Sequence, residues 1–120
     1  MGIRLIKIAG VYFVIAILMG MYMSMSHQFQ LRGVHTHLNL VGWVSMALAG
    51  ILYHLFPAAA ESRLAKIHFW LHNLALPVMM LGVAFLSYGR TEFAGIIPIG
   101  AIPLIIGLIL FVVNLFRNVK

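Results

Sequence analysis

Residues 93–116, FAGIIPIGAIPLIIGLILFVVNLF, decide the class of this protein, because they form an uncharged run of 24 residues between Glu92 and Arg117. A helix that crosses the hydrocarbon core of a bilayer needs about 20 apolar residues at about 1.5 Å each. A buried helix of a soluble bundle would carry charged residues on its outward face, and this run has none. We therefore expect a membrane-spanning helix here.

Three further uncharged runs precede this one: 24 residues between Lys7 and Arg32, 28 between Arg32 and Glu61, and 23 between Lys66 and Arg90. The chain of 120 residues is 63% hydrophobic and 8% charged, which is too apolar for a soluble domain of this size. The sequence therefore predicts one domain, 1–120, folded as an all-α integral membrane four-helix bundle. The predicted helices lie at about 5–26, 31–56, 63–88 and 93–116.

The basic residues predict how this bundle is oriented. Six of the eight Lys and Arg residues lie at the N-terminus, in the second connection and at the C-terminus, which leaves Arg32 and Arg90 for the other side. Cytoplasmic segments carry an excess of Lys and Arg, so both termini are expected in the cytoplasm. Because the net charge of +6 is dispersed over helix ends, we expect the lipid bilayer and no nucleic acid as a partner.

Several local patterns refine this prediction. Residues 1–26 are interpreted as the first helix and not as a cleaved leader, because the apolar run is long and lacks a small-residue cleavage site. Pro57 is expected to end the second helix, and Ser62 to cap the third. The Pro and Gly residues of the fourth helix indicate kinks or close helix contacts. The absence of Cys excludes disulfides, thiolate metal sites and covalent c-type haem attachment.

Histidine is the most informative residue type, because polar groups inside a membrane are costly unless they are used. The chain has six His and only two acidic residues. A neutral imidazole can coordinate iron, copper or zinc in an apolar setting, and the alternative role is a hydrogen bond between helices. Five of these residues together favour a cofactor or metal site. They are His35, His37, His54, His68 and His72.

The rise of the helices sorts these histidines into two levels. His54 and His68 are expected at matching depth near the cytoplasmic side, and His72 on the same face as His68, so a metal centre between the second and third helices is predicted. His35 and His37 lie near the outer face and point about 200° apart, so they cannot both face one iron. A haem ligated by one of them and by a residue of another subunit would make the protein a homo-oligomer.

The first helix carries Met at every second position from Met19 to Met25, followed by His27. Thioether sulfur is a soft ligand for Cu(I), which keeps a copper-handling function open. On a helix Met19, Met23 and His27 share one face, whereas Met21 and Met25 lie elsewhere. Flexible apolar packing is the more common role of such residues.

The stretch RGVHTHLNLVGW, residues 32–43, together with Gly50, Tyr53 and Pro57, resembles the second helix of haem-copper oxidase catalytic subunits, in particular the nitric oxide reductase and cbb3-type branches. The stretch KIHFWL, residues 66–71, resembles the start of a late helix of the same subunits. This resemblance implies a haem b bound near the outer face by His35 or His37. It also implies electron transfer in the bacterial cytoplasmic membrane, with quinol or respiratory-complex subunits as partners.

The chain also departs from that family. It has four predicted helices instead of about twelve, and it lacks the paired-His copper motif, so reduction of oxygen or nitric oxide by one subunit is not expected and enzymatic activity stays open. Asn39, Trp43 and Asn73 are candidates to surround a haem, and Arg32 and Arg90 to pair with its propionates. Two other hypotheses remain, a copper-binding protein and a cofactor-free accessory subunit.

Overall fold

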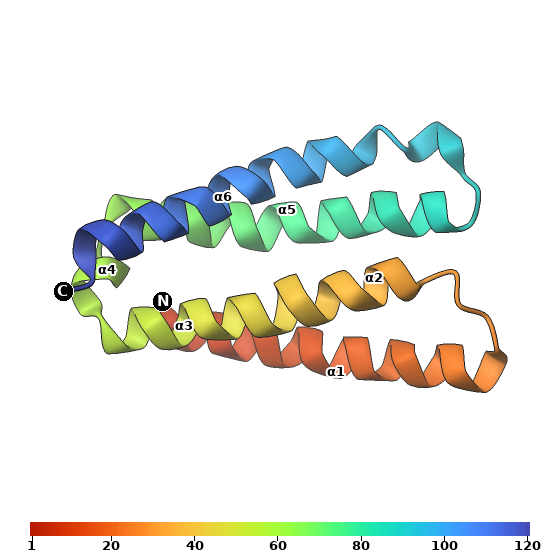
Figure 1. Cartoon of the computed structure of the whole chain (residues 1–120), viewed down its shortest axis with the longest axis horizontal. Helices are drawn as coiled ribbons and strands as arrows, with labels where there is room; N and C mark the ends of the chain where they lie inside the picture. Colours follow the sequence, from red (N-terminus) through yellow and green to blue (C-terminus); the bar gives the residue numbers. More distant parts are fainter.

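The computed structural model describes all 120 residues as a set of antiparallel helices (Figure 1). The first long helix is α1 (Gly2–Ser26). The second consists of α2 (Arg32–His37), the π-helical segment η1 (Leu38–Val44) and α3 (Ser45–Leu55) in direct succession. The third is α5 (Arg63–Ser87) and the fourth is α6 (Ile96–Asn118), while the short elements α4 (Pro57–Ala60) and η2 (Thr91–Phe93) lie in the connections.

Four of these stretches are long and apolar enough to cross a membrane: Gly2–Ser26, Arg32–Leu55, Arg63–Ser87 and Thr91–Asn118. Their bounds agree with the predicted ones to within a few residues at each end. The prediction of an all-α chain with four membrane-length helices is therefore confirmed.

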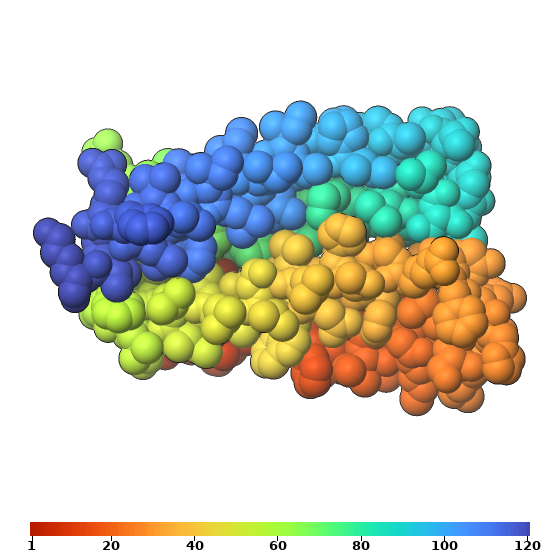
Figure 2. All heavy atoms as spheres, in the orientation of Figure 1, coloured from red at the N-terminus to blue at the C-terminus, as the bar shows by residue number.

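The four helices form two hairpins. The N-terminal hairpin pairs α1 with the Arg32–Leu55 helix, and the C-terminal hairpin pairs α5 with α6 (Figure 1). Contacts between the two hairpins are sparser than those inside each, and in the space-filling view the hairpins meet along a seam that runs the length of the molecule (Figure 2). Both termini and α4 lie at one end, called here the terminal end, and the connections 27–31 and 88–95 lie at the other, the loop end.

Glycine allows the close packing inside each hairpin. A Cβ atom on Gly50 would lie 2.7 Å from the carbonyl oxygen of Gly2, so the backbones of α3 and α1 touch at this point. Gly100 of α6 lies directly against the backbone of Met79 in α5. Small residues allow such close approach of helices in membranes, and the close contact predicted for the fourth helix is confirmed.

The predicted helix ends in the middle of the chain are also confirmed. The α3 helix ends at Leu55, and Pro57 is the first residue of α4. The Ser62 hydroxyl accepts a hydrogen bond of 3.1 Å from the Ala65 amide and caps α5. The buried Asn114 of α6 adds a contact that the sequence did not predict, because its Nδ2 donates to the Ala59 carbonyl at 2.9 Å and joins α6 to this connection.

The π-helical segment η1 is the second unpredicted feature. In a π-helix each amide bonds to the carbonyl five residues earlier, and the Ser45 N–H accordingly donates to Leu40. In an α-helix the same amide would donate to Val41. The Val41 carbonyl is therefore free of its α-helical donor, and it points to the centre of the molecule, where the site described next uses it.

Candidate functional site

Two fully buried histidines lie at the seam between the hairpins. His68 and His72 of α5 have no exposed surface. The His72 Nε2 atom is 2.8 Å from the Val41 carbonyl oxygen, and the His72 Nδ1 atom is 3.1 Å from His68 Nε2. The His68 Nδ1 atom is 2.9 Å from the hydroxyl of Tyr53. These residues form one continuous hydrogen-bonded chain, called here the buried chain: Tyr53, His68, His72 and the Val41 carbonyl.

The direction of every bond in the buried chain follows from its last member. A carbonyl can only accept, so His72 carries a proton on Nε2, and in a neutral imidazole Nδ1 is then an acceptor. His68 must then carry its proton on Nε2 and accept at Nδ1, and Tyr53 donates its hydroxyl proton there. With both imidazoles neutral, each carries its proton on Nε2.

The buried chain connects elements of both hairpins. Tyr53 and Val41 belong to the N-terminal hairpin and the two histidines to the C-terminal one. Phe111 of α6 covers the site, with its ring centroid 4.9 Å from that of His68 and 5.7 Å from that of Tyr53. No buried side-chain nitrogen or oxygen in the protein lacks a partner. The polar groups at the seam are thus fully satisfied inside a shell of apolar side chains.

A hydrogen-bonded chain of this kind can pass protons along or hold two helices together, and the geometry here favours the second role. A relay needs an acceptor at its end that can pass the proton onward, and the carbonyl of Val41 cannot do so. Nδ1 of His68 and Nδ1 of His72 both accept hydrogen bonds in this arrangement, so neither atom has a free electron pair for a metal ion. In this arrangement the buried chain joins the two hairpins.

The structure does not bring His54 to the predicted inner metal centre. His68 does meet the second helix at the expected depth, but its neighbour there is Tyr53, and His54 lies one residue further around the helix on the exposed surface. One residue corresponds to about 100° of rotation. No group of three or more His, Asp or Glu side chains is placed to hold a metal ion. The shared face of His68 and His72 is confirmed by their hydrogen bond.

Near the loop end, His35 connects α2 to α1. Its Nδ1–H donates to the Ala16 carbonyl at 2.8 Å, and its Nε2 lies 3.5 Å from the Asn39 amide nitrogen. The ring packs so closely on α1 that a Cβ atom on Gly20 would lie 2.9 Å from its Cε1. This packing leaves no room for a planar cofactor between His35 and α1.

His37 has a different environment. Its side chain is exposed, and Nδ1 donates to the Gly33 carbonyl at 2.7 Å. This bond places the proton on Nδ1, so Nε2 keeps an unshared electron pair and has no partner in the protein. A backbone carbonyl that fixes the tautomer in this way is typical of metal-ligating histidines. His35 contacts α1 and His37 is exposed, so the two rings do not share one environment.

The residues predicted to surround a haem are distributed over several places. Asn39 donates to the His35 carbonyl at 2.9 Å, and Trp43 packs on Phe13 of α1 with ring centroids 4.8 Å apart, so both lie on the α1 side with His35. Asn73 donates to Phe69 within its own helix. These three side chains therefore belong to helix packing and do not accompany His37.

The two arginines of the loop end also differ. Arg90 bonds to Glu92 at 2.6 Å and lies over the Phe93 ring, with 5.4 Å between the guanidinium carbon and the ring centroid. Arg32 is exposed and has no carboxylate partner. Only Arg32 is therefore free to pair with an acidic group such as a propionate.

The methionines of α1 do not gather into one site. Met23 is buried and Met19 is partly buried, whereas Met21 and Met25 are exposed. His27 follows at the C-terminal end of α1, in the left-handed conformation and exposed. Met19 and Met23 are therefore the two α1 methionines that pack inside the bundle.

No protein-family model, curated protein or solved structure matches the chain. The resemblance to haem-copper oxidase subunits therefore depends on residues 32–43 and 66–71 and stays a prediction.

Proposed function

We propose that this protein spans the bacterial cytoplasmic membrane four times, with both termini in the cytoplasm, and binds haem b through His37 for electron transfer. Four membrane-length helices support insertion. The orientation is supported by the terminal end, which carries six of the eight basic residues: Arg4, Lys7, Arg63, Lys66, Arg117 and Lys120.

The state of His37 is the observation that carries the haem proposal. Among the six histidines it is the one whose Nδ1 is held by a carbonyl while Nε2 has no partner. His35, His68 and His72 use their rings to connect helices. An exposed, pre-oriented imidazole on an apolar helix would hold a haem iron through Nε2.

The second axial ligand comes from another copy of the chain in this proposal. No other imidazole of the same chain is bonded to His37, and its side chain faces away from the bundle. A two-fold axis would place the His37 side chains of two subunits on opposite faces of one haem. Arg32 lies five residues earlier, roughly 7–8 Å along the helix axis, and is free to pair with a propionate.

A haem held there would supply a one-electron carrier inside the membrane. The protein would contribute the ligand tautomer set by Gly33, the charge of Arg32 and an apolar surface that excludes water. Quinol or a subunit of a respiratory complex is the proposed electron donor. Reduction of oxygen or nitric oxide is not part of the proposal.

The visible spectrum of the purified protein tests this function. We expect an intense Soret band, a sharp b-type band on reduction, and a dimer or higher oligomer. His37→Ala should remove the haem. The control is His54→Ala, which changes another exposed histidine, near the terminal end, and should leave haem content unchanged. Haem retained at the wild-type level in His37→Ala would refute the ligand assignment.

A cofactor-free accessory subunit is the second candidate function, and the buried chain favours it. There the imidazoles of His68 and His72 act only in hydrogen bonds. A colourless, metal-free protein would support this candidate. Copper found by elemental analysis would instead support a copper-binding protein, whose ligands would have to come from more than one copy because one chain has no group of three donors.

A further inference from the structure

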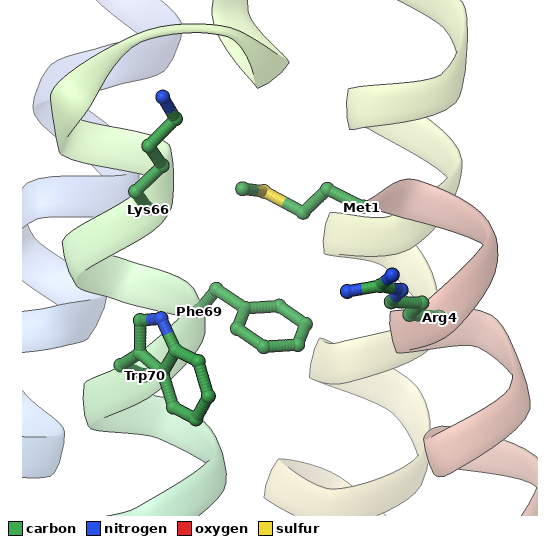
Figure 3. Close-up of a pocket in the computed structure, with 5 residues that line it drawn as sticks. All are labelled: Met1, Arg4, Lys66, Phe69 and Trp70. Carbon is green, nitrogen blue, oxygen red and sulfur yellow. The ribbon is translucent and has the colours of Figure 1, made fainter.

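A groove at the terminal end opens between the two hairpins. It has a volume of about 310 Å³ and lies between the first turns of α1 and the first turns of α5. Arg4 approaches from α1 and Lys66 from α5, on opposite walls (Figure 3). Phe69 and Trp70 lie one turn further from the end, and Met1 completes the lining. The groove therefore has a cationic rim and an aromatic floor.

The two cations of this groove have no acidic partner. The single salt bridge of the protein joins Arg90 to Glu92 at the loop end. Glu61 is the only acidic residue at the terminal end, and it lines a different groove together with Tyr53 and His54. Two cations without an acidic partner on opposite walls of one groove favour the binding of an anion.

The floor of the groove indicates what kind of anion fits. Trp70 is 60% exposed, and Phe69 is partly buried beside it. Aromatic side chains near the end of a membrane helix lie at the level of the lipid headgroups. An occupant with a negatively charged head and an apolar body would match the rim and the floor at once.

We propose that this groove binds the phosphate of an anionic phospholipid, with Arg4 and Lys66 on the phosphate and an acyl chain against Phe69 and Trp70. Basic pockets between membrane helices on the cytoplasmic side are suited to such headgroups. The bound lipid would bridge the two hairpins across their sparse interface. This inference rests on the membrane insertion proposed above and is independent of haem.

Binding to lipid vesicles or mixed micelles tests the groove in the full-length protein. Native mass spectrometry should detect phosphatidylglycerol bound to the detergent-solubilised chain, with phosphatidylcholine bound far less. Arg4→Gln with Lys66→Gln should weaken phosphatidylglycerol binding about fivefold for each cation, and so about 25-fold together. Inorganic phosphate at the same concentration should not compete, since it lacks the acyl chain.

The chain offers a matched control. Lys7→Gln with Arg63→Gln removes the same charge from the same two helices, three residues away from each groove cation. These residues do not line the groove, so the control should bind phosphatidylglycerol like the wild type. Equal losses in both double variants would overturn the proposal in favour of general surface charge. Equal binding of phosphatidylcholine and phosphatidylglycerol would also overturn it, and haem content measured on the same samples would report separately on His37.

Discussion

Histidine has different environments at two places in this protein, at the seam between the hairpins and on the exposed face of α2. His68 and His72 are fully buried, and all four of their ring nitrogens are bonded within the protein. His37 is exposed, and one of its nitrogens is left free. Burial in a membrane-length helix therefore does not by itself indicate a ligand. The number of unshared lone pairs separates a cohesive histidine from a candidate ligand.

The largest effect on stability is expected from His68→Leu. The change removes the middle of the buried chain, and both the Tyr53 hydroxyl and His72 Nδ1 lose their hydrogen bonds to His68. We expect a loss of about 2–4 kcal/mol in the free energy of unfolding, measured by denaturation in detergent micelles. His54→Leu is the control and should change stability little, because His54 is exposed. Similar losses of unfolding free energy in both variants would contradict the distinction between the buried His68 and the exposed His54.

A smaller effect is expected from Tyr53→Phe. The change keeps the ring that packs on Phe111 and removes only the donor to His68. A hydrogen bond between membrane helices contributes about 0.6–1.7 kcal/mol, so a loss of about 1 kcal/mol is expected in the same denaturation assay. Tyr22→Phe serves as the control, since Tyr22 is exposed. A Tyr53→Phe variant as stable as the wild type would show that the chain does not hold the hairpins together through this bond.

The smallest effect on stability is expected from His37→Ala. Its one bond is to Gly33 in the same turn of helix, so we expect a change under about 0.5 kcal/mol. His35→Ala breaks the bond to Ala16 on another helix and should cost more, about 0.6 kcal/mol or above. The histidine with the least influence on folding would then be the one proposed to hold haem. A larger loss in His37→Ala than in His35→Ala would reverse the roles assigned to them.

Much of the fold could be predicted from the sequence, because charged residues mark the ends of each membrane-length helix. Pro57 and Ser62 act locally, so their effects on α3 and α5 were also predictable. The division into two hairpins was not, since it depends on how closely Gly50 and Gly100 let neighbouring helices approach. The periodicity of a sequence indicates which side chains share one face of a helix, but it does not give the distance from that helix to each neighbour.

The candidate site was predicted in part. Helical rise placed the second helix against His68 at the right depth, but the rotation of the helix brought Tyr53 to it in place of His54. The partner of His72 is a backbone carbonyl, and no side chain in the sequence marks it. Helical spacing predicted that His35 and His37 point to different sides of the helix. Only the packing of the His35 ring on Gly20 of α1 distinguishes this partly buried ring from the exposed ring of His37.

The π-helical segment Leu38–Val44 also limits how this sequence can change over evolutionary time. A π turn holds an extra residue within an otherwise α-helical run. Because the wider turn absorbs that residue, deleting one residue between 38 and 44 would restore α-helical bonding and leave the helix before and after the segment in nearly the same relative rotation. The carbonyl that now accepts from His72 would then be bonded within its own helix. We therefore expect related sequences that lack this residue to lack a histidine at the position of His72 as well, while the positions of His37 and Tyr53 are kept.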